Sequence, residues 1–82
     1  MFGLFGKSDF ESENNKLENE HKALGAQLLK SMQQINISEQ IRIMESMLNL
    51  YARRIECCKK YGKTDLVLKL ELEREQLQRL HG

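Results

Sequence analysis

Apolar residues in the middle of the chain recur at alternating spacings of four and three positions. They form a seam made up of Ile37, Ile41, Met44, Leu48, Tyr51, Ile55 and Cys58. This spacing puts every member on one face of an α-helix and is typical of helices that pack along a shared seam. The sequence therefore predicts a helix over about residues 39–61, with Leu48 and Ile55 buried on its central seam.

A second apolar stripe lies beside this seam on the same predicted helix. Its members are Ile43, Met47, Leu50, Cys57 and Tyr61, and Arg54 interrupts it. The two stripes together cover about half of the helix circumference, which is wider than the face that a helix needs against one neighbour. We therefore expect a central helix with two contacts, on which Met47 and Leu50 form apolar surface left over for a partner.

A helix is also predicted before the central one, over about residues 9–35. Its apolar stripe consists of Leu17, Leu24, Leu28 and Ile35. His21 and Ser31 occupy intervening positions of the same stripe, where a polar side chain fixes register at some cost in stability. We expect His21 to lie at the edge of this stripe.

The last predicted helix covers about residues 65–81 and has a stripe of Leu66, Leu70, Leu77 and Leu80. Leucine at every even position from 66 to 72 also fits the alternation of a β-strand. We favour the helix, because its residues are good helix formers and a lone strand has no partner. In a helix, Leu68 and Leu72 point away from the main stripe and leave apolar surface for another contact.

Connections of about three residues separate the predicted helices, which makes consecutive helices antiparallel neighbours. Ser38 is the candidate N-cap of the central helix, and Gly62 suits the left-handed position just past its end. Antiparallel pairing sets the acidic residues 9–20 beside the basic residues 53–63. These opposite charges therefore favour the antiparallel orientation of the two helices. The predicted fold is all-α, either a small antiparallel three-helix bundle or a helical hairpin with an extension.

The chain has 82 residues, of which 40% are hydrophobic and 30% charged. A core of this size supplies no more than about 3–5 kcal/mol, so we expect residues 8–82 to form one helical domain that is oligomeric through its second or third helix. A chain this short has few residues left to line a ligand pocket. We therefore expect no enzyme activity, no cofactor and no small-molecule substrate.

Residues 1–7 are predicted to be a flexible apolar tail. All three phenylalanines of the chain lie within the first ten residues, and burying an exposed phenylalanine contributes about 1.5–3 kcal/mol. Phe2, Leu4 and Phe5 are therefore candidate anchors, either on the chain's own helices or a twin subunit, in a groove of another protein, or in a membrane. Lys7 is the one cation among the first fifteen residues and three carboxylates follow it, which disfavours an anionic membrane.

The formal net charge of +1 gives no overall attraction for nucleic acid. The basic residues near 53–63 scatter over different helix faces, and the last helix carries a net charge of −1 (three Lys and Arg against four Asp and Glu). Nucleic-acid binding is therefore the weakest of the interactions considered.

Cys57 and Cys58 are adjacent and the chain has no other cysteine. Adjacent positions on a helix diverge by about 100°, so the pair is unsuited to zinc, and we expect no metal site. Two neighbouring cysteines make no disulfide framework, and we find neither a signal peptide nor an apolar run of about 20 residues. These features favour a cytoplasmic protein.

The sequence predicts a small protein-interaction module, such as an adaptor, co-chaperone or inhibitor, whose partner is another protein or a second copy of the chain. The predicted contact residues are Phe2, Leu4, Phe5, Met47, Leu50, Leu68 and Leu72. The alternatives are a peripheral membrane protein that uses its tail and a nucleic-acid-binding protein.

Overall fold

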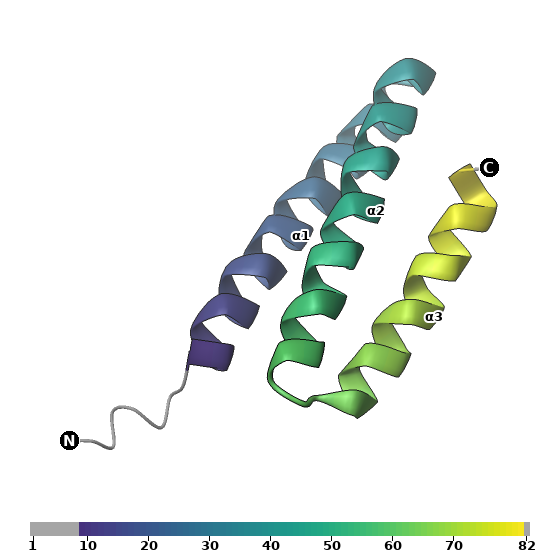
Figure 1. Cartoon of the computed structure of the whole chain (residues 1–82). Helices are drawn as coiled ribbons and strands as arrows, with labels where there is room; N and C mark the ends of the chain where they lie inside the picture. The colour runs from purple at the N-terminus through teal and green to yellow at the C-terminus, as the bar shows by residue number, and fades with distance from the viewer. Residues whose placement is uncertain (1–8, 82) are drawn as a thin grey trace.

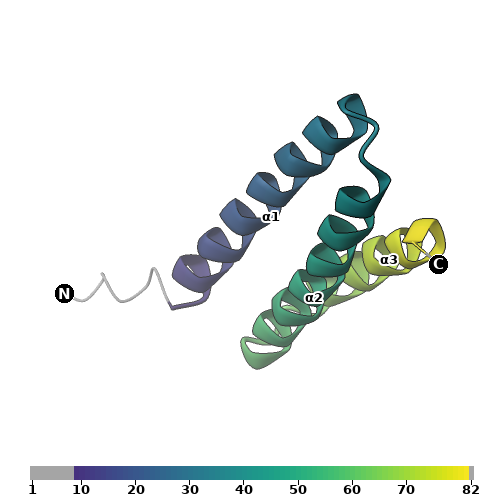
Figure 2. The same cartoon turned by 90° about the horizontal axis from the view of Figure 1, so that it is seen from above.

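The computed structural model describes residues 9–81, which contain three α-helices and no strand. The helices are α1 (Asp9–Gln33), α2 (Ile37–Lys60) and α3 (Thr64–His81). α1 and α3 each pack along α2 and scarcely touch one another, so α2 is the central helix (Figure 1 and Figure 2). The all-helical prediction, including a helix rather than a strand at the start of α3, is confirmed. The predicted tail lies outside the described residues.

The core consists of two clusters, one on each side of α2. Leu17 of α1 packs with Leu50 and Cys57, while Tyr51, Ile55 and Cys58 pack with Leu70 of α3; Phe10 contacts both clusters. The cluster with Leu17 uses the second stripe of α2, and the cluster with Leu70 uses its seam. One helix therefore packs against two others that scarcely contact each other.

Met47 and Leu50 are part of this core, and the prediction that they form surplus apolar surface is wrong. Their exposed fractions are 8% and 2%. The second stripe of α2 is the face on which α1 packs, so these side chains are already buried within a single chain. Leu48, expected to be buried, is half-buried.

The turn between α2 and α3 ends the central helix as the sequence predicts. Gly62 has a φ of +71°, and the amide of Lys63 donates to the carbonyl of Cys58 at 2.8 Å. The amide of Gly62 donates to Lys59 at 3.1 Å. These two bonds form a Schellman motif, which satisfies carbonyls at the helix end and favours glycine at the left-handed position.

The turn between α1 and α2 uses the same two bonds with a β-branched residue at the left-handed position. Ile35 has a φ of +53°, its amide donates to Met32 at 3.1 Å, and that of Asn36 donates to Ser31 at 2.9 Å. α1 therefore ends at Gln33 and not at residue 35. A β-branched residue with positive φ is strained.

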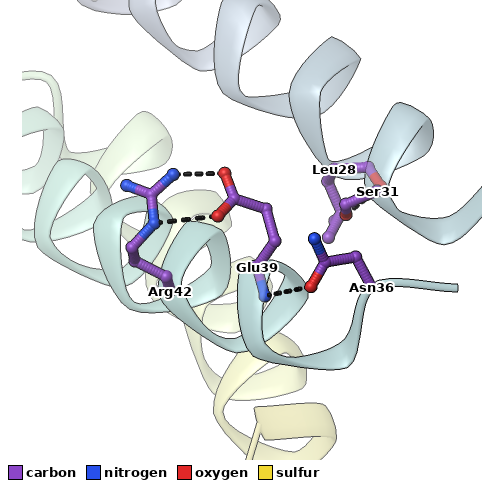
Figure 3. Close-up of polar contacts among 5 residues, drawn as sticks. All are labelled: Leu28, Ser31, Asn36, Glu39 and Arg42. Carbon is purple, nitrogen blue, oxygen red and sulfur yellow. Dashed lines mark hydrogen bonds and ion pairs between the residues drawn. The ribbon is translucent and has the colours of Figure 1, made fainter. Parts of the chain in front are cut away.

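Asn36 caps α2, and the prediction that Ser38 does so is wrong. The side-chain oxygen of Asn36 accepts a hydrogen bond from the amide of Glu39 at 3.1 Å (Figure 3). Because the Schellman turn is complete at Asn36, the chain enters α2 at Ile37, two residues earlier than the sequence suggests.

The hydroxyl of Ser31, which is buried, donates to the carbonyl of Leu28 at 2.7 Å.

Replacing Ile35 with glycine should raise the free energy of unfolding by roughly 1 kcal/mol, because glycine removes the steric cost of the left-handed conformation. Ile35 is 79% exposed, so little packing is lost. The midpoint of urea denaturation measures the gain. Ile35→Ala is the matched control, since it shortens the side chain but keeps the Cβ atom; equal stability of the two variants would contradict this account.

Candidate protein-interaction surface

Ion pairs between α1 and α2 set the relative position of the two helices. Glu13 Oε1 lies 3.3 Å from Lys60 Nζ, and Glu20 pairs with Arg53 at 3.0 Å. The predicted meeting of the acidic start of the first helix with the basic end of the second is therefore confirmed. These groups are largely exposed, so the pairs fix register more than they stabilise the fold.

Arg54 and His21, the polar interruptions of two apolar stripes, meet between α1 and α2. An Nη1 proton of Arg54 points to Nδ1 of His21 at 3.2 Å, and Nη2 lies 3.7 Å from Glu18. Arginine is a donor only, so His21 accepts with Nδ1 and is neutral. Burial, and then the charge of Arg54, hold the pKa of His21 below its usual value, although Glu73 opposes this.

Tyr51 extends this polar group to α3. Its hydroxyl donates to Glu73 at 3.2 Å, and its ring meets that of His21 edge to face with the centroids 5.0 Å apart. Burial, followed by the charge of Glu73, raises the pKa of Tyr51 to about 12. The space between α1 and α3 is thus bridged by side chains of α2 in the half of the molecule near the α2–α3 turn.

Two of the concave regions of the structure are poorly suited to a small-molecule ligand. A cleft of ≈ 200 Å³ beside Arg54 is lined by charges of both signs, among them Glu18, Lys69 and Glu73. It is smaller than typical ligand pockets. A groove of ≈ 690 Å³ between α1 and α2 is open to solvent, and the Glu13–Lys60 pair already occupies its wall.

Exposed large apolar side chains gather where α1 turns into α2. They are 43–79% exposed, and we call them the distal surface: Leu29, Met32, Ile35, Ile37 and Ile41. Continuing the register of the α1–α2 ion pairs places Met32 level with Ile41.

The distal surface is exposed because α2 is longer than α3. The helices have 24 and 18 residues, and α3 ends at His81, whose Nε2 lies 3.4 Å from Glu45 Oε2. Ile41 and Ile37 lie one and two turns beyond Glu45 on the seam of α2, where α3 supplies no cover. α2 extends past the end of α3 (Figure 1), and the seam of α2 continues with it.

Charges around the distal surface are few and largely compensated. Arg42 donates from Nε to Glu39 Oε1 at 3.1 Å and from Nη2 to the other oxygen of the same carboxylate (Figure 3). This bidentate pair adds no net charge. Lys30, which is exposed in the last turn of α1, adds one positive charge beside it. The distal surface therefore offers aliphatic side chains beside a rim with few charges.

The predicted contact residues fall into three groups. Phe2, Leu4 and Phe5 lie outside the described residues, and Met47 and Leu50 are core. Leu68 and Leu72 are 58% and 62% exposed on α3, as expected. The distal surface was not among the predicted contacts. The available signal was that the predicted central helix is longer than the last one.

Comparison with protein-family models, curated proteins and solved structures finds no match to this chain. Within residues 9–81, no helix is long and apolar enough to cross a membrane, and no three His, Cys, Asp or Glu side chains gather as metal ligands do. The case for a function accordingly rests on the surfaces of the chain itself.

Proposed function

We propose that the chain is a small protein-interaction module that binds an amphipathic helix of another protein at its distal surface. The observation that carries this proposal is the uncovered end of the α2 seam, where Ile37 and Ile41 continue the line that α3 follows. Soluble proteins rarely leave a contiguous group of large apolar side chains in water without a binding role.

The shape of the site favours a helix as the occupant. A helix placed beyond the end of α3 meets Ile41 and Ile37 one turn apart, and Met32 of α1 lies level with Ile41. Amphipathic helices dock on apolar surfaces through apolar residues at spacings of three and four. The rim has Lys30 and Arg42 as its basic residues, and Arg42 is paired with Glu39. This favours a protein over an anionic lipid surface, which binds through clusters of basic residues.

In this proposal, the antiparallel helices form a platform and perform no bond chemistry. Moving a large aliphatic side chain from water to a fully buried position contributes about 1.5–3 kcal/mol to binding. The distal surface has five large apolar side chains that are exposed by 43–79%, so each contributes part of this amount. Because association itself costs several kcal/mol, we expect affinity in the micromolar range. Covering a partner's helix is the action of an adaptor, a co-chaperone or an inhibitor.

A photoreactive amino acid at position 37 tests the proposal. Irradiation in an extract of the host should link the chain that carries this residue in place of Ile37 to one discrete protein, and sequencing of the adduct should place the link in an amphipathic helix. The matched control has the same photoreactive residue at position 66, an exposed leucine of α3 that lies outside the distal surface (37% exposed against 61%). Adducts with lipid alone, with a second copy alone, or equally from both positions would refute the proposal.

A further inference from the structure

The outer side of α3 carries a strip of exposed residues at spacings of three and four. The strip consists of Asp65, Leu68, Leu72, Glu75 and Arg79. Within α3, the buried residue is Leu70, and the strip lies on the opposite side of the helix. Two leucines that are 58% and 62% exposed therefore lie between charged ends and face away from α2.

The charges of the strip are complementary to those of a second copy of the strip that runs in the opposite direction. When two copies of α3 run in opposite directions with Leu72 at the centre, Asp65 of each copy is level with Arg79 of the other. Lys69, which is also exposed, is then level with Glu75, whose carboxylate lies 3.3 Å from Arg79 of its own helix. A parallel pair would instead set Asp65 against Asp65 and Arg79 against Arg79. Opposite charges select orientation and suppress wrong pairings.

We propose that two copies of the chain associate through this strip, with their α3 helices antiparallel around Leu72. Leu68 and Leu72 of both copies form the apolar centre, and two Asp65–Arg79 pairs close its ends. The site is isologous, as the contacts of a two-fold dimer are. Because the interface uses one helix per copy, it is smaller than a standard interface and the dimer is reversible at micromolar concentration.

This dimer is independent of the proposed function, because the strip and the distal surface share no residue. It leaves both distal surfaces free, so the assembly presents two binding sites. Two linked sites hold a partner that has two copies of the recognised helix more tightly than either site alone.

Sedimentation velocity over a concentration series, with the full chain, tests the dimer. Asp65→Arg and Arg79→Asp should each weaken the homodimer by about tenfold or more, since each replaces two attractions with two repulsions. An equimolar mixture of the two variants should restore dimerisation. In the mixed dimer the two substituted side chains face each other with opposite charges, and the native Arg79 of one copy meets the native Asp65 of the other. Circular dichroism should show all of these variants to be folded.

Glu56→Arg is the matched control, because it makes the same charge change on an exposed position of α2. It should leave the homodimer unchanged, and Arg79→Asp should enter mixed dimers with it far less than with Asp65→Arg. Leu72→Gln should abolish the dimer while Ile37→Asp keeps it. A chain that stays monomeric up to millimolar concentration, or a dimer that Ile37→Asp abolishes and Leu72→Gln spares, would overturn the proposal without bearing on helix capture at the distal surface.

Discussion

Replacing Ile55 with alanine should lower the free energy of unfolding by about 2–5 kcal/mol. Ile55 is 4% exposed and packs with Tyr51, Cys58 and Leu70, where α3 meets α2. The cavity forms between two helices joined by one turn, and a domain of this size has about 3–5 kcal/mol in total. Most molecules of the variant should therefore be unfolded at 25 °C, as circular dichroism at 222 nm measures.

Leu48→Ala is the matched control for Ile55→Ala. Both residues belong to the same seam of α2, but Leu48 is half-buried, so its truncation should cost less than half as much. Ile55→Val, which removes a single methylene, should cost about 0.5–1.5 kcal/mol and stay folded enough for a complete denaturation curve. Equal losses at positions 48 and 55 would mean that the seam is buried evenly and that α3 covers more of α2 than the structure indicates.

Tyr51→Ala should have the second large effect, a loss of about 3–5 kcal/mol. The side chain of Tyr51 is 7% exposed and contacts His21 with its ring, while its hydroxyl bonds Glu73. Removing it takes away core packing and also the link between α1 and α3 that this side chain provides. Thermal unfolding followed by circular dichroism should show a single transition at a much lower temperature.

Tyr51→Phe separates the two contributions of this side chain. It keeps the ring and removes the hydrogen bond to Glu73, so it should cost about 1 kcal/mol. A loss as large as that of Tyr51→Ala would assign the stability to the hydroxyl and contradict the packing explanation. Arg54 and Glu73 are untouched by both variants, which makes the comparison specific to position 51.

The number of helices and the central position of α2 follow from periodicity alone, because two neighbouring apolar stripes need two neighbours. Periodicity does not say which stripe packs against which helix. Met47 and Leu50 were therefore placed on the surface, although both are buried in the core. The deciding quantity is the length of each neighbour, since a stripe stays exposed wherever the neighbouring helix has ended.

The turns illustrate a second limit of sequence reasoning. Gly62 was predictable, because glycine is the usual residue at a left-handed helix end. Ile35 was not, because a β-branched residue there is rare, and the predicted helix was extended through it. The choice of Asn36 over Ser38 as the cap follows directly from where that turn closes.

The contact between His21 and Arg54 was within reach of the sequence. Each residue was recognised as a polar interruption of an apolar stripe, and the charges of residues 9–20 and 53–63 already indicated how the two helices align. Placing Glu20 beside Arg53 sets His21 level with Ala52, and the long side chain of Arg54 reaches His21 from two residues further along α2. A polar residue in one stripe therefore indicates a polar partner nearby on the facing stripe, within reach of a long side chain.

The isoleucine methyl groups give the most direct test of the distal surface. Ile35, Ile37 and Ile41 belong to it, whereas Ile43 and Ile55 are 1% and 4% exposed in the core. A methyl-labelled chain should be titrated, by nuclear magnetic resonance, with a synthetic peptide of the helical segment that crosslinks at position 37. The account predicts shifts at Ile35, Ile37 and Ile41, with Ile43 and Ile55 nearly unchanged. Shifts absent from these three methyl groups, or of equal size at Ile55, would contradict it.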